Sequence, residues 1–133
     1  MRLWPLSILS QLPRQQLLGQ HRECCALRGK GWGRKHATVD YVFKHPYAWL
    51  YEYHKAVMLE MWKRRFVPSP WWWDIEFRGK GLEYDYSEFT MRKESPCATI
   101  YPEHDAAYLA ECVENLARKG VKIKELSNER HKA

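Results

Sequence analysis

Two groups near the start of the chain could together carry out chemistry on a sugar: the amino group of Met1 and the carboxylate of Glu23. An α-amino group has a pKa near 8, against about 10.4 for lysine, so roughly a tenth of it is unprotonated at neutral pH. The unprotonated amine can attack a sugar C1′ atom and form an imine. A carboxylic acid nearby can protonate the departing oxygen and then assist removal of a proton. This chemistry requires neither a metal nor a cofactor, and none is predicted.

The distribution of charge points to a polyanionic partner. The first 44 residues hold eight Lys and Arg residues and only two acids, Glu23 and Asp40, whereas the other 89 residues are balanced. The whole formal net charge of +6 therefore lies in the segment that also carries Glu23. A basic surface of this kind is typical of proteins that bind nucleic acid.

A glycine-rich segment follows Glu23, and its sequence is RGKGWGRKH over residues 28–36. Glycines let backbone N–H groups come close to an anion, and the cations Arg28, Lys30, Arg34 and Lys35 can neutralise phosphate. The glycine spacing matches neither a dinucleotide-binding fingerprint nor a Walker loop. The alternative interpretation is a solvated turn, and the lack of neighbouring acids favours contact with phosphate.

Hydrophobic periodicity predicts an all-α chain with three helices. The first spans residues 13–30, and its predicted apolar stripe contains Leu17, Leu18, His21, Cys24, Cys25 and Leu27. The second runs from residue 46 to about 65, with Leu50, Tyr53, Val57, Met58 and Met61 facing inward. The third is predicted to begin at Pro102 and to end at Gly120. We expect a compact three-helix bundle with long irregular loops, formed by one domain over residues 1–133.

The segments between the helices give weaker signals. Residues 38–44 fit a short strand or a linker equally well, and residues 67–99 predict a long loop. That loop contains Trp71, Trp72 and Trp73, which could pack over the helices or act as a wedge between bases. Aromatic clusters are more often core than site, so packing is favoured.

Cysteine usage and hydropathy indicate the compartment. The four cysteines include the adjacent pair Cys24 and Cys25, which does not resemble a secreted disulfide framework. His21, Cys24, Cys25 and His36 could be imagined as zinc ligands, but adjacent cysteines differ from the usual ligand spacing, so buried reduced thiols are favoured. There is no convincing signal peptide and no apolar run of membrane-spanning length. We expect a cytoplasmic monomer with no membrane association and no obligate protein partner.

Several stretches of the chain resemble the pyrimidine-dimer DNA glycosylase family of the phage endonuclease V type, in particular its bacterial branch. The stretches are MRL at the start, LPRQQLLGQHRECCALRG around Glu23, GRKH at 33–36, KRRF at 63–66 and IYPEHDAAYLAECVENLARKG at 100–120. The resemblance implies a three-helix fold and an N-terminal α-amine that forms the imine. It also implies a first-helix glutamate that supports both steps, a neighbouring arginine that holds phosphate, and double-stranded DNA that is bent with a base flipped out.

The chain departs from the family pattern at three places. Arg2 is bulky, so Met1 should be retained and its amine should take the nucleophile's place. A family arginine one turn after the glutamate falls at Ala26, with Arg28 as the nearest replacement, and a family histidine is Gln16 here. The aromatic C-terminal tail of the phage enzyme is absent.

These observations lead to a DNA repair glycosylase with abasic-site lyase activity that acts on damaged pyrimidines. Met1 is the predicted nucleophile and Glu23 the acid and base. The predicted DNA-binding residues are Arg2, Arg22, Arg28, Lys30, Arg34 and Lys35. The alternative is a non-catalytic basic protein that binds nucleic acid, in which Glu23 only pairs with Arg22.

Overall fold

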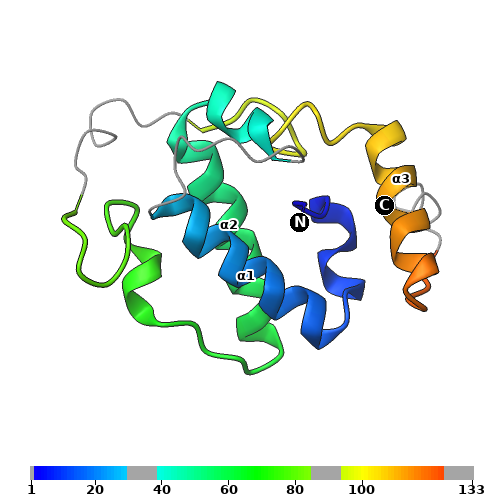
Figure 1. Ribbon diagram of the computed structural model, residues 1–133, viewed down its shortest axis with the longest axis horizontal. Coiled ribbons are helices and arrows are strands. Elements are labelled where there is room, and N and C mark those ends of the chain that lie inside the picture. Colours follow the sequence, from blue (N-terminus) through cyan, green and yellow to red (C-terminus); the bar gives the residue numbers. More distant parts are fainter. Residues whose placement is uncertain (1, 30–38, 85–93, 125–133) are drawn as a thin grey trace.

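Three α-helices dominate the computed structural model, which describes residues 2–29, 39–84 and 94–124 (Figure 1). They are α1 (Arg14–Arg28), α2 (Tyr47–Lys63) and α3 (Ala106–Arg118). Three short 3-10 helices accompany them: η1 (Leu6–Gln11), η2 (Asp40–Lys44) and η3 (Pro70–Trp73). The described residues contain no strand, and the predicted all-α class is confirmed.

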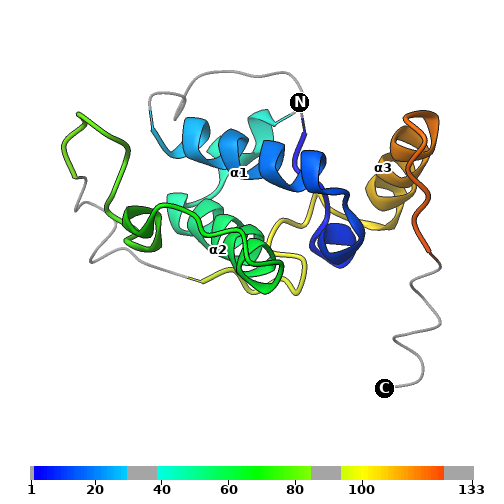
Figure 2. The ribbon, with the colours of Figure 1, turned by 90° about the horizontal axis from the view of Figure 1, so that it is seen from below.

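Helices α1 and α2 pack directly on each other and form the main core (Figures 1 and 2). Every residue predicted to line the inner face of α2 is buried, and they are Leu50, Tyr53, Val57, Met58 and Met61. From α1, the side chains of Leu17, Cys24 and Leu27 enter the same core. The helical spacing of apolar residues therefore determines this pair.

The N-terminal segment lies between this pair and α3 (Figure 1). Leu3, Ile8 and Leu12 are completely or almost completely buried, and the Tyr108 hydroxyl of α3 donates a hydrogen bond to the Leu3 carbonyl at 2.8 Å. Arg64, which caps the C-terminal end of α2, donates to the carbonyls of Leu9, Ser10 and Leu12. Arg64, which belongs to the KRRF stretch, therefore fastens the N-terminal segment to α2.

The ends of the helices differ in detail from those predicted. Pro13 is the N-cap residue of α1 and not its first helical residue, and α1 ends at Arg28. Helix α3 begins at Ala106 instead of Pro102, because the Asp105 carboxylate accepts a hydrogen bond from the Tyr108 amide at 2.9 Å and caps the helix there. The predicted stop at Gly120 is confirmed: its φ of 83° permits the Val121 amide to bond to the Leu116 carbonyl.

The connecting segments contain little regular structure, as expected. Residues 40–44, for which a strand or a linker was predicted, form the 3-10 turn η2. Within residues 67–84 and 94–99, the parts of the long loop that the structure describes, η3 is the one helical turn. No helix in the described residues has both the length and the apolarity needed to cross a membrane.

Candidate active site

A cleft of about 280 Å³ opens where the N-terminal segment, α1 and α3 meet. Its lining is mostly polar and consists of Arg2, Trp4, Gln16, Gly19, Gln20, Glu23, Asn115 and Lys119. Among the described residues, a methyl group added at Gly19 would meet only Arg22 Nη2, at an ordinary 3.7 Å, so these residues leave room beside this position of α1. The cleft therefore combines one carboxylate with two cations, Arg2 and Lys119, which favours the entry of an anion.

The side chain of Gln20 holds the N-terminal segment against α1. Its Oε1 atom accepts a hydrogen bond from the Trp4 amide at 2.7 Å, and its Nε2 atom donates to the Arg2 carbonyl at 3.1 Å. The Tyr53 hydroxyl also lies 2.8 Å from Oε1. Gln20 is only 3% exposed, so these bonds are shielded from water and fix residues 2–4 in position.

Glu23 lies one helical turn after Gln20 and is half-buried at the same cleft. Arg2 reaches the cleft from the other wall, and its Nη1 atom lies 3.2 Å from Glu111 Oε2 and 3.7 Å from Cys112 Sγ. Two residues that the sequence places 21 positions apart thus share one cavity. A carboxylate beside a cationic wall is suited to exchanging protons with a bound anionic substrate.

A model of the pyrimidine dimer DNA glycosylase family matches residues 1–74. The chain belongs to this family. The match covers the N-terminal segment, α1, η2, α2 and η3, and so includes Arg2, Gln20 and Glu23 but not α3. No curated protein and no solved structure matches the chain.

Membership of the glycosylase family makes DNA the expected substrate. The structure places three of the predicted site residues at or beside the cleft. Arg2 and Glu23 line the cleft, and Arg22 is exposed beside it. Met1, Lys30, Arg34 and Lys35 lie outside the described residues, as does His36. Their predicted roles remain predictions.

The prediction that Arg28 contacts DNA is wrong. Its side chain is completely buried, and all five of its N–H groups have acceptors within the protein. Nε donates to the Tyr47 hydroxyl, while the two terminal nitrogens donate to His54 Nδ1 and to backbone carbonyls of residues 72, 74 and 77. Arg28 therefore anchors the loop after η3 to the end of α1, where neighbouring Gly29 admits the Arg78 carbonyl: an added Cβ would lie 2.6 Å from that oxygen.

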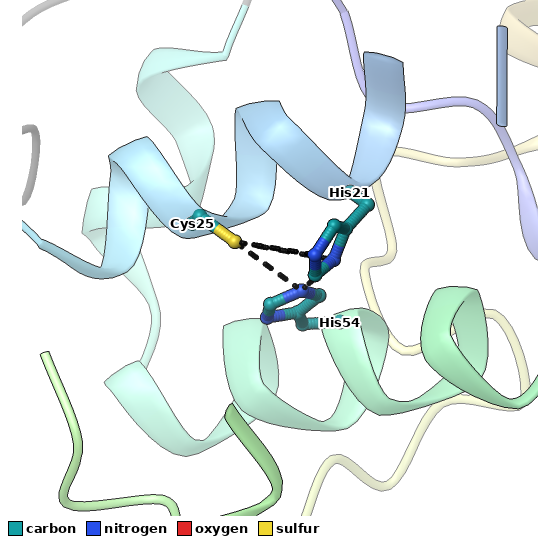
Figure 3. A group of neighbouring side chains, drawn as sticks. All are labelled: His21, Cys25 and His54. Atoms are coloured by element: carbon teal, nitrogen blue, oxygen red, sulfur yellow. Dashed lines mark hydrogen bonds between the residues drawn. The ribbon is translucent and has the colours of Figure 1, made fainter. Parts of the chain in front are cut away.

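Two imidazoles and one thiol, from His21, His54 and Cys25, meet on the opposite side of α1 from the cleft (Figure 3). Their donor atoms all lie within 4.8 Å of one another, with His21 Nδ1 2.8 Å from His54 Nε2. This group differs from the imagined zinc set, because Cys24 is buried in the core and His54 was not considered. The spacing of His21 and Cys25, four apart on one helix, was the available signal.

The hydrogen bonds of this cluster do not suit a metal. Arg28 can only donate, so His54 Nδ1 must accept, and the proton of the neutral ring then sits on Nε2, which donates to His21. A ligating imidazole needs a free lone pair on the metal side and usually donates its other N–H to an acceptor. Burial also raises the pKa of Cys25 to about 12, which keeps its thiol protonated. The cluster is therefore a hydrogen-bond network that joins α1 to α2.

The three tryptophans of η3 are neither core nor fully exposed. Trp71 is 60% exposed, whereas Trp72 packs edge-on against Phe77 with ring centroids 4.7 Å apart. Both tryptophans line a second, more apolar hollow of about 490 Å³ together with Ser69, Phe77, Lys80 and Tyr84. Packing by Trp72 agrees with the favoured interpretation, but Trp71 projects from the surface.

Among the cleft residues that reasoning from the sequence did not single out are Gln20, Asn115 and Lys119. Gln20 stands within the apolar stripe of α1, and a polar residue at a buried helical position was a usable signal. Asn115 and Lys119 are four residues apart on the third helix and therefore share one of its faces. Nothing in the sequence indicated that this face meets the N-terminal segment.

Proposed function

We propose that this protein is a DNA glycosylase that also cleaves the abasic site it creates, with the α-amine of Met1 as the nucleophile. The observation that supports this most directly is that Arg2 and Glu23 line the same cleft. Met1 is joined to Arg2 by one peptide bond, and its amine is the proposed nucleophile at the same cavity. The substrate is double-stranded DNA carrying a damaged pyrimidine.

The reaction begins when the unprotonated amine attacks C1′ of the damaged nucleotide. The C1′–N bond to the base breaks, the base leaves with a proton, and opening of the sugar ring breaks the C1′–O4′ bond. Glu23 in its acid form delivers the proton that O4′ requires, and the product is an imine between the amine and C1′. The Glu23 carboxylate then accepts a proton from C2′, and the 3′ phosphate leaves as the C3′–O bond breaks. Hydrolysis of the imine restores the amine.

Positioning is provided by groups that do not react. Gln20 fixes the carbonyl of Arg2 and the amide of Trp4, which limits the positions open to the amine. Arg2, Arg22 and the cations at 30, 34 and 35 neutralise phosphates on either side of the damaged nucleotide. The half-burial of Glu23 keeps bulk water from competing for its proton.

Borohydride trapping on a duplex with a single abasic site tests the proposal. Reduction of the imine should leave a covalent protein–DNA adduct, and mass spectrometry should locate it on Met1. A preparation acetylated at the N-terminus should bind the duplex and form no adduct. If untreated protein binds without forming an adduct, the chain is a nucleic-acid-binding protein without this activity.

Glu23→Gln separates catalysis from support of the helix. The substitution keeps the shape and hydrogen-bonding capacity of the side chain, so the melting temperature should be preserved. Strand cleavage should fall by a factor on the order of 100, which is the usual contribution of a general acid or base. A stable variant with full cleavage would remove Glu23 from the mechanism.

A further inference from the structure

The hollow of about 490 Å³ beside η3 is separate from the cleft, and the proposed lyase reaction gives it no role. Its volume is within the range of about 300–1,000 Å³ that is usual for ligand pockets. It shares no lining residue with the cleft. Helix η3 and helix α3, which borders the cleft, lie at opposite ends of the molecule (Figures 1 and 2).

A row of aromatic rings forms the wall of this hollow. The Phe77 ring packs edge-on against Trp72, with centroids 4.7 Å apart, and its centroid lies 5.5 Å from that of Tyr84. Arg28 holds the row in place, because its Nη1 atom donates to the Trp72 carbonyl at 2.9 Å. Trp71 is 60% exposed and Tyr84 is 39% exposed, so both keep ring surface that a ligand could cover. Such a surface suits a flat aromatic ligand, which gains from stacking.

The charges near the hollow favour a ligand that also carries a negative charge. Among the six described residues that line it, only Lys80 is charged, and it is exposed. Leu82 connects this region to the end of α1, since its Cδ1 atom would lie 3.5 Å from a Cβ added at Gly79 and 3.7 Å from one added at Gly29. The basic segment at 30–35 follows Gly29 directly in the sequence. A nucleotide combines the two required features, an aromatic base and a phosphate.

We propose that the hollow binds an unpaired nucleobase of single-stranded DNA, with the base stacked on Trp71 and Tyr84 and the adjoining phosphate near Lys80. In a duplex, each base is stacked between its neighbours and presents only its edges, so its ring faces cannot enter the hollow. A single strand exposes those faces, and stacking on aromatic side chains tolerates any base. The match to a DNA glycosylase family includes Ser69, Trp71 and Trp72. The inference does not depend on the imine chemistry.

Fluorescence anisotropy with an undamaged thymidine oligonucleotide, alone and paired with its complement, tests this inference. Trp71→Ala should weaken binding of the single strand about tenfold, the loss expected for one stacked base, and should leave binding of the duplex unchanged. Trp71→Phe keeps a stacking ring and should retain most of the affinity. Trp62→Ala is the matched control, because Trp62 is 58% exposed on α2 but does not line the hollow. It should change neither affinity.

Two further measurements locate the phosphate and the base. Lys80→Gln should reduce the slope of log affinity for the single strand against log salt by about 0.7, as expected for one phosphate contact. Irradiation of a single strand that carries 5-iodouracil should cross-link the base to an aromatic residue of the hollow, and mass spectrometry should place the adduct on Trp71, Trp72 or Tyr84. Both measurements remain decisive if Trp71→Ala does not fold.

The outcomes distinguish this inference from the proposed function. Equal losses in Trp71→Ala and Trp62→Ala, or equal losses for single strand and duplex, overturn the base-binding role of the hollow. Cross-links found only outside residues 69–84 overturn it as well. Wild-type protein that does not bind the single strand also overturns it, and the aromatic surface then fits an apolar peptide instead. Absence of an imine adduct on an abasic duplex contradicts only the proposed lyase activity.

Discussion

The two sides of α1 carry similar residue types but differ in what those residues contact. On the cleft side, Glu23 and Arg22 lie beside a cavity of about 280 Å³. On the α2 side, the equally polar Arg28, His21 and Cys25 bond to α2 and to the loop after η3. The fold thus places some polar side chains of α1 at the cleft, where a ligand could bind, and uses others to hold α1 against α2.

The difference shows that the number of protein acceptors around a cation, more than its charge, decides whether it can bind a phosphate. Arg28 has a protein acceptor for each of its five N–H groups, and so has nothing left to offer a phosphate. The exposed Arg22 keeps its charge in water, where it can exchange solvent for a phosphate at little cost. Substitutions on each side of α1 should therefore have opposite consequences.

The largest effect is expected from Arg28→Met. The variant leaves three backbone carbonyls, the Tyr47 hydroxyl and His54 without their donor, and it should lower the free energy of unfolding by about 3–5 kcal/mol. Urea denaturation measures this loss. Arg28→Lys should be almost as damaging, because an ammonium group cannot supply the same fork of donors. A stable Arg28→Met protein with reduced DNA affinity would restore the original prediction for this residue.

Gln20→Leu should have an intermediate effect on stability and a larger one on chemistry. The Trp4 amide loses its buried acceptor, which should cost about 1–3 kcal/mol. Because residues 2–4 are then free to move, imine trapping should fall by more than the fraction of unfolded protein explains. Trapping yield and melting temperature should be followed in one preparation. If the loss of trapping is no larger than the fraction of unfolded protein explains, Gln20 has a purely structural role.

The α2 side should also be sensitive to acid. Burial, together with the charge of Arg28 and the neighbouring His21, lowers the pKa of His54 well below its usual value, and burial lowers that of His21. An unfolded chain takes up these protons below about pH 6.5, while the folded protein resists them. Stability should therefore be complete above about pH 6.5 and fall as the pH decreases, by about 1.4 kcal/mol per pH unit for each imidazole.

Urea midpoints at pH 7.5, 6.5 and 5.5 measure this dependence. His54→Gln provides the control, since its amide oxygen can accept from Arg28 and does not titrate. The variant should show a shallower decline between pH 6.5 and 5.5 than the wild-type protein. An equal decline in both proteins would assign the acid sensitivity to other groups.

The smallest effect on stability is expected from Arg22→Met, the partner experiment to Arg28→Met. Arg22 is exposed, so the free energy of unfolding should change by no more than about 0.5 kcal/mol. Loss of one phosphate contact should reduce the slope of log affinity against log salt by about 1. Fluorescence anisotropy with a labelled duplex at several salt concentrations measures the slope. An unchanged slope would show that Arg22 does not contact phosphate.

The sequence by itself determined the helices and the basic charge of the first 44 residues. Apolar residues at spacings of three and four residues determine which face of α2 is buried, because this spacing follows from local helical geometry. The charge imbalance and the isolated Glu23 are likewise properties of the chain alone. The family match over residues 1–74 agrees with the resemblance first seen around Glu23.

Tertiary structure alone decided which polar residues face the cleft and which serve the core. Arg28 follows Glu23 by five residues and looks like another phosphate ligand, but the loop carbonyls that surround it come from residues 72–77. Gln20 accepts a hydrogen bond from the Trp4 amide, and Asn115 lines a cleft with Arg2 and Trp4. In both cases the neighbouring N-terminal segment is distant in sequence. Local periodicity predicts which face of its own helix a side chain occupies. It does not predict which distant segment packs against that face. Long-range contacts therefore separated the candidate active site from the core on the two sides of a single helix.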